Sequence, residues 1–176
     1  MAKSTKRSKS DIIKFHKEVL VELVDIYISK GIDTVQKVKD INGKSKLEDS
    51  LWKIPEAGGK YNQRYVSEGV KSILDSIAAP YNYPNDNFTS AINKFLKSSK
   101  DSIQLEHVVE KAKIIELIFD NPSNTANIVD KYNIGCTVLK SEHGKLPNNL
   151  FAKDDVWIRY KRAGIKVWDR EDKKFI

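Results

Sequence analysis

The chain has 176 residues, of which 40% are hydrophobic and 31% charged, a composition typical of one folded domain and not of a disordered chain. Its single cysteine excludes a disulfide framework and zinc sites built on two or four cysteines, and no apolar run approaches the ~20 residues of a membrane span. The formal charge is +7, and the basic start lacks the apolar segment of a secretory signal, so we expect a cytoplasmic protein, in its own cell or, for a phage gene, in the host.

Two kinds of spacing predict the elements. Apolar residues three or four positions apart indicate helices, and alternation indicates strands. In chain order, the expected helices run from Ser10 to Gly31, over 33–41, from Glu68 to about Ala78, from Asp86 or Asn87 to Leu96, from Asp101 to Ile118, over 125–132, and from Asp154 or Asp155 to Gly164. The expected strands cover 136–139 and 165–168, and residues 43–65 are expected to be a loop with a short extended piece at 51–54.

These elements predict an α+β fold that is mainly α-helical and has a small β-sheet. No internal repeat and no linker-like segment divides the chain. We therefore expect residues 10–176 to form a single globular domain, preceded by a flexible basic arm at residues 1–9.

The positive charge lies at the two ends of the chain. Residues 1–17 carry six bases and one acid, and residues 153–176 carry eight bases and five acids. Residues 18–152 carry one acid more than they carry bases. Basic segments bind phosphates because each contact releases counterions, so nucleic acid, duplex DNA above all, is the expected partner. The alternative is a solubilising tail on an ordinary surface.

The predicted loop contains a cluster that suits nucleic acid. After two glycines come Lys60, Tyr61, Asn62, Gln63 and Arg64. Basic side chains contact phosphates, amides read base edges, and a tyrosine ring stacks on a base. The sequence therefore predicts a nucleic-acid-binding loop here, and the alternative is an ordered surface loop whose tyrosines pack on the helices.

The last predicted helix supplies further candidate contacts. Arg159 and Arg162 lie three positions apart and so share a helix face, and both are expected to contact nucleic acid from the surface. Trp157, on the same segment, is expected to be core. A helix-turn-helix over residues 28–41 is a weaker alternative, because its second helix would be short for DNA recognition.

Two acid–histidine dipeptides suggest metal-dependent hydrolysis. Glu106 precedes His107, and Glu142 precedes His143. Carboxylates and imidazoles bind divalent metals, and a histidine can act as a general base toward water. We expect His107 and Glu106 to be catalytic, and Glu106, Glu142 and His143 to hold Mg²⁺ or Mn²⁺. The alternative is that both histidines are surface residues of helices.

The segments around these dipeptides loosely resemble nucleases of the HNH (ββα-metal) type. In that family an acid–histidine pair activates water beside one metal that a further histidine or asparagine holds. The resemblance covers about a fifth of the chain and carries over to Glu106, His107 and His143 only. It implies metal-dependent DNA cleavage. The family presents its histidine on a β-hairpin, whereas the pattern around His107 predicts a helix.

Other functions stay open on the sequence. Glu171 and Lys173 follow a predicted strand with the Glu-x-Lys spacing of PD-(D/E)xK nucleases. A non-enzymatic module that binds nucleic acid or protein through its basic surfaces is the main alternative, and a structural protein is the third. The leading hypothesis is a DNA-binding protein that acts as a small metal-dependent endonuclease of HNH-like character.

Overall fold

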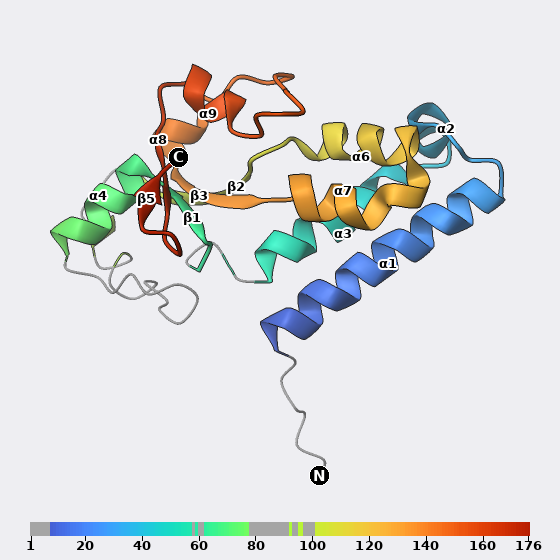
Figure 1. Cartoon of the computed structure of the whole chain (residues 1–176), viewed down its shortest axis with the longest axis horizontal. Coiled ribbons are helices and arrows are strands. Elements are labelled where there is room, and N and C mark those ends of the chain that lie inside the picture. Colours follow the sequence, from blue (N-terminus) through green and yellow to red (C-terminus); the bar gives the residue numbers. More distant parts are fainter. Residues whose placement is uncertain (1–7, 58, 60–61, 78–91, 93–94, 97–100) are drawn as a thin grey trace, which may run out of the picture. The chain divides into compact units, whose positions relative to one another are not determined.

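The computed structural model of the chain describes residues 8–57, 59, 62–77, 92, 95–96 and 101–176. Contacts group the chain into two compact units. The helical unit comprises Met1–Ala57 and Lys111–Asn133, and the sheet unit comprises Gly58–Glu110 and Ile134–Ile176. The expected α+β class, mainly helical with a small sheet, is confirmed (Figure 1).

All the regular secondary structure among the described residues of the helical unit is helical. The long helix α1 begins at Lys9, one residue before the expected Ser10, because Ser8 caps it and accepts a hydrogen bond from the Asp11 amide at 3.1 Å. Its buried residues recur at helical spacing, as predicted. The elements of this unit are α1 (Lys9–Ser29), α2 (Val35–Asp40), α3 (Lys44–Glu56), α6 (Lys111–Asp120), the short 3-10 helix η1 (Pro122–Asn124) and α7 (Thr125–Tyr132).

The expected loop over 43–65 is wrong for most of its length. Residues 44–56 form α3, and the expected extended piece at 51–54 lies inside it. Leu47, Leu51 and Ile54 are buried at positions i, i+4 and i+7, which is one face of a helix. The glycine before this helix and Pro55 in its last turn obscured the pattern, although a proline so close to the end disrupts little of the helix.

The sheet unit is built on five short strands in the order β2-β3-β1-β4-β5. The pair β1–β3 is parallel, and the pairs β2–β3, β1–β4 and β4–β5 are antiparallel. The strands are β1 (Tyr65–Ser67), β2 (Ile103–His107), β3 (Gly135–Leu139), β4 (Val167–Asp169) and β5 (Lys174–Phe175), and the helices are α4 (Glu68–Ser76), α8 (Lys140–His143) and α9 (Ile158–Arg162).

The expected helix from Asp101 to Ile118 is wrong in its first half. Residues 103–107 form β2, which pairs with β3 so that Glu106 lies opposite Cys136 and His107 lies opposite Gly135. The helix begins only at Lys111. The apolar residues of β2 and α6 happen to follow one another at helical spacing, and only the pairing with β3 distinguishes them.

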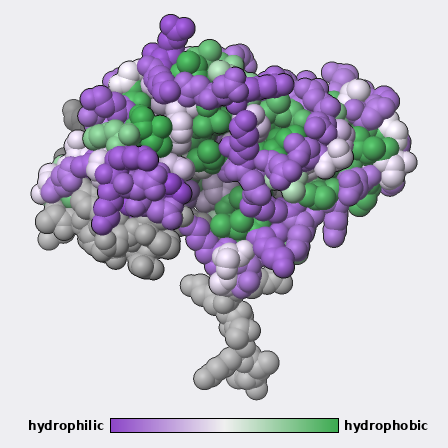
Figure 2. Space-filling view, viewed as in Figure 1, coloured by the Kyte–Doolittle hydropathy of each residue, from purple (hydrophilic) through white to green (hydrophobic). Residues whose placement is uncertain are grey.

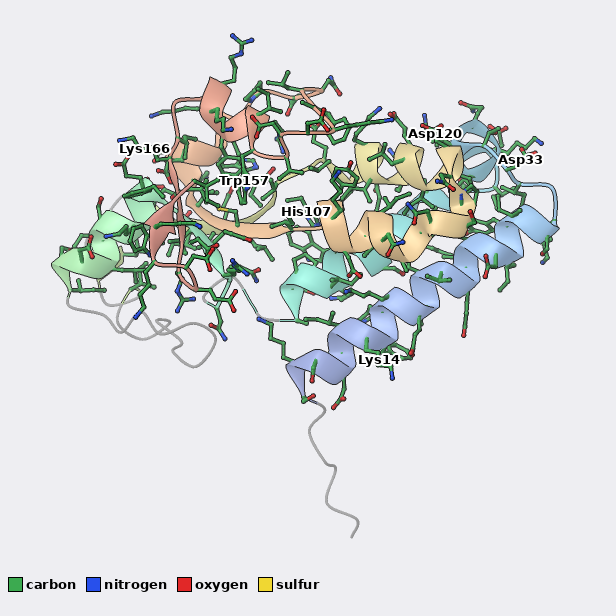
Figure 3. All side chains as sticks on the ribbon, in the orientation of Figure 1. Lys14, Asp33, His107, Asp120, Trp157 and Lys166 are labelled. Carbon is green, nitrogen blue, oxygen red and sulfur yellow. The ribbon has the colours of Figure 1, made fainter. Side chains whose placement is uncertain are left out.

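Each face of the sheet packs against its own helix. On one face Cys136, Val138 and Val167 pack with Trp157 and Tyr160, so the expectation that Trp157 is core is confirmed (Figure 3). On the other face Val66 packs with α4. Two-residue alternation along β3 and β4 sends neighbouring side chains to opposite faces. Because Glu106 pairs with Cys136, it belongs to the face that α9 covers.

Among the described residues, no helix is long and apolar enough to cross a membrane. Hydrophilic side chains dominate the face drawn in Figure 2, and hydrophobic ones occupy separate small areas of it. Most of the expected helix from Asp86 or Asn87 to Leu96 lies outside the described residues.

Candidate functional site: a histidine beside a partly buried carboxylate

Three side chains from three elements of the sheet unit meet beside the sheet. His143, at the end of α8, places Nε2 3.0 Å from Oε2 of Glu106 on β2. Arg159, on α9, donates from Nη1 to the other oxygen of the same carboxylate, Oε1, at 3.1 Å. Glu106 is thus held from both sides, by a cation that is always charged and by an imidazole.

Arg159, the partner of Glu106, is buried and is held by several hydrogen bonds. Its side chain is 5% exposed, and it donates from Nε to the Pro147 carbonyl at 2.9 Å and from Nη1 to the His107 carbonyl at 3.1 Å. The expectation that Arg159 contacts nucleic acid from the surface is wrong. The guanidinium neutralises a carboxylate of which 14% is exposed, and a buried charge of either sign requires such a partner.

His143, unlike Arg159, is accessible to solvent, because 46% of its side chain is exposed. The helix α8 that carries it begins directly where β3 ends, without an intervening loop. Figure 1 shows β3 running into α8. The site therefore joins an accessible imidazole to an ion pair of a buried guanidinium and a partly buried carboxylate.

His107 does not join this site. It follows Glu106 on β2, and adjacent strand residues point to opposite faces of a sheet. His107 is also buried, at 5% exposure. The expected catalytic pair of His107 and Glu106 is therefore not brought together, and the surface position of the alternative reading is wrong for His107 as well. Figure 3 labels His107 where the strand ends.

Glu142 has a structural role. Its Oε2 accepts hydrogen bonds from the Ser67 hydroxyl and from the Leu139 amide at 2.9 Å, and its Oε1 accepts one from the Gly69 amide at 3.1 Å. These contacts join α8 to the start of α4 and to β1. Both oxygens of Glu142 are occupied by donors of the chain itself.

The residues expected to hold a divalent metal do not fit one. Donors of the chain bind both oxygens of Glu142, and Arg159 places a positive charge against Glu106, where a cation would have to bind. Within the described part of the chain, no group of three or more His, Cys, Asp or Glu side chains could hold a metal ion. A general acid–base site fits the geometry better than a metal centre does.

The predicted nucleic-acid-binding loop is only partly described. Lys60 and Tyr61 lie outside the described residues. Gln63 is buried and donates to the Gly59 carbonyl at 2.8 Å, and Asn62 Oδ1 accepts from Arg170 at 3.5 Å. These amides contact the chain itself, which agrees with the alternative of an ordered loop for this part.

Arg64 is also engaged within the sheet unit. It forms a two-pronged pair with Asp169, from Nε at 3.0 Å and from Nη2 at 2.6 Å. Its Nη1 pairs with Glu171, and Nη2 lies 3.5 Å from Asp172. Three carboxylates thus surround one guanidinium. Glu171 is therefore part of an ion-pair cluster. This structural role accounts for Glu171 without a nuclease site of the PD-(D/E)xK type.

Exposed basic side chains flank His143 in the chain. Lys140 and Lys145 are exposed at either end of the α8 turn, defined here as residues 140–145, and Arg162 is exposed at the end of α9. Within the described part of the chain, none of these three cations has an ion-pair partner. Sequence reasoning overlooked Lys140 and Lys145, although their spacing around His143 was visible.

Comparison of the chain with protein families, with curated proteins and with solved structures finds no match. The resemblance to HNH nucleases therefore stays a prediction.

Proposed function

We propose that the protein binds the phosphodiester backbone of nucleic acid through the α8 turn, with Lys140, His143 and Lys145 as the contacting residues. The observation that carries the proposal is the orientation of Glu142. This residue is the one acid of the turn, and its carboxylate is turned inward onto the Ser67 hydroxyl and the Gly69 amide. The exposed charged side chains that the turn itself supplies are therefore those of Lys140 and Lys145, and the neighbouring acid Asp101 is engaged by Ser141.

The charge of the chain supports the same function. The sheet unit carries sixteen Lys and Arg against twelve Asp and Glu, and the segment from 134 to 176 accounts for the whole excess. The remaining excess comes from the first residues of the chain, Lys3, Lys6 and Arg7. A positive surface attracts a polyanion over several ångströms and gains affinity from each counterion that it displaces.

The residues expected to hold the metal for DNA cleavage are engaged otherwise, since donors of the chain bind Glu142 and Arg159 pairs with Glu106. The non-enzymatic alternative, a binding module that uses basic surfaces, is the simplest form of the proposed function. Duplex DNA, the expected partner, and single-stranded RNA carry the same phosphodiester and serve as the two probes.

A binding titration with a matched pair of variants tests the proposal. The double variant K140A/K145A should bind both probes more weakly, and the slope of log Kd against log salt should fall by about 0.9 for each duplex phosphate contact that is lost. The control variant K39A/K46A removes two exposed lysines of the helical unit that also have no ion-pair partner among the described residues. Equal salt slopes for the two double variants would refute the proposed surface.

A further inference from the structure

We infer that His143 is the general base of a metal-independent site that cleaves RNA, with the 2′-hydroxyl of the substrate as the nucleophile. This inference rests on the proposed function, since it requires that the α8 turn bind a phosphodiester. It adds a reaction, a substrate class and a role for the buried pair of Glu106 and Arg159.

The contact with Glu106 determines which nitrogen of His143 is available. Oε2 of Glu106 lies 3.0 Å from Nε2, and a carboxylate oxygen would repel a nitrogen lone pair at that distance. The proton of the neutral ring is therefore placed on Nε2, and Nδ1 keeps the lone pair. A base needs that lone pair free, and the 46% exposure of the side chain leaves the ring accessible to a substrate.

Arg159 makes Glu106 a rigid support for the imidazole. The carboxylate is 14% exposed and is bound at Oε1 by a guanidinium that backbone carbonyls hold in turn, so Oε2 cannot rotate away from His143. Carboxylates that orient a catalytic histidine act in this way, by fixing its tautomer and its direction. Glu106 and Arg159 are positioning residues in this scheme.

The described residues around His143 offer no nucleophile of their own. Cys136 lies opposite Glu106 on β3, but it is fully buried, and burial raises the pKa of its thiol. The hydroxyl of Ser141, two residues before His143, is bound to the carboxylate of Asp101. The attacking oxygen must then come from the substrate or from water, and RNA carries a hydroxyl beside every phosphate.

The reaction balances without any further reactant. Nδ1 of His143 takes the proton of the 2′-hydroxyl, and the 2′-oxygen forms a bond to phosphorus. The bond from phosphorus to the 5′-oxygen breaks, and the departing oxygen takes a proton from water, which leaves hydroxide to accept the proton from His143. The products are a 2′,3′-cyclic phosphate and a free 5′-hydroxyl. Lys140 and Lys145 would stabilise the negative charge on the phosphate during the transfer.

The test is cleavage of a mixed-sequence single-stranded RNA, and of the DNA of the same sequence, in the presence of excess EDTA. We expect the full chain to cleave the RNA to cyclic-phosphate ends and to leave the DNA intact. H143A and H143Q should each be slower by about 100-fold or more, as general bases contribute at least that much. H16A, which changes a histidine of the helical unit, should cleave at the wild-type rate.

The positioning role of Glu106 has its own readout. Nitrogen NMR of His143 should show the proton on Nε2 at high pH in the wild type, and E106Q should shift the tautomer toward Nδ1. RNA that is bound but never cut in EDTA would overturn this inference and leave the proposed function standing. A protein that neither binds nor cuts RNA or DNA would overturn both, and cleavage that persists in folded H143A would overturn the role of His143.

Discussion

Arg159 and Glu106 form an ion pair at 3.1 Å across the face of the sheet, joining α9 to β2. Their separation in the chain is 53 residues, so the pair holds two distant segments of the sheet unit together. A guanidinium with 5% of its side chain exposed is an unusual core residue, since arginine is almost never fully buried unless it is paired. The pair is both a structural joint and the support of His143.

R159A should lower the free energy of unfolding by about 3 kcal/mol, because it leaves the Glu106 carboxylate largely buried without its cation. R162A removes an exposed arginine from the same helix and should change stability by less than about 0.5 kcal/mol. Urea denaturation measures both. Equal stabilities of the two variants would mean that the ion pair contributes little to the fold.

G69A should destabilise the sheet unit by about 1–3 kcal/mol through overpacking. A Cβ at this position would lie 2.6 Å from Oε1 of Glu142 and 2.9 Å from a methyl group of Leu139, so the bond from the Gly69 amide to Glu142 must shift. G144A is the matched control, since its Cβ would meet only the Lys140 carbonyl, at 3.8 Å. Thermal unfolding that ranks G144A as the less stable variant would contradict the role given to Glu142.

R64A should reduce stability more than it reduces nucleic-acid binding, contrary to the original expectation for Arg64. Burial alone would raise the pKa of Asp169, but the hydrogen bonds from Arg64 and from the amides of Asp172 and Glu171 outweigh it and lower that pKa below 3.8. A pKa that is lower in the folded protein than in the unfolded chain stabilises the protein above pH 3.8. This contribution is lost as the pH falls through the pKa of Asp169 in the folded protein. Stability measured between pH 2 and 6 should therefore depend less on pH in R64A than in the wild type.

Alkaline pH should destabilise the protein through Cys136. Burial raises the pKa of this thiol from its ordinary value of 9.0, so the unfolded chain ionises first. The stability that the buried neutral thiol contributes is complete below pH 9.0 and is lost as the pH rises above 9.0. C136A should flatten the fall of stability above pH 9.0, measured by urea denaturation. A thiol reagent that modifies the folded wild-type protein rapidly at pH 8 would show that Cys136 is not buried.

Local patterns were sufficient to predict the helices that have strong caps and one apolar face. The start of α4 at Glu68, with Ser67 as its cap, follows from residues within one turn of each other. The bounds of α7 were also predicted, from its apolar face, although its N-cap Asn124 makes no side-chain capping bond. The boundaries of β2 and α3 could not be read this way. The apolar residues of β2 precede those of α6 at helical spacing, and only the register with β3 makes them a strand.

The candidate site depended on the same long-range information. The sequence drew attention to Glu106 and His143, and the structure brings these two together. It could not show that Glu106 and His107 lie on opposite faces of a sheet, because that follows from the strand which the pattern concealed. Nor could it show that Arg159 is buried, since a basic residue three positions from another on a short helix has the usual pattern of a solvent-facing pair.

The most direct test of the central claim, that the α8 turn binds nucleic acid, is an NMR titration of the ¹⁵N-labelled chain. Duplex DNA and single-stranded RNA are added separately at low salt, and amide shifts are followed along the whole chain. The account predicts that the amides of residues 140–145 shift with either probe, and that those of α2 and the first turn of α3, which carry Lys39 and Lys46, stay unchanged. Shifts confined to the helical unit, or none at all, would contradict it.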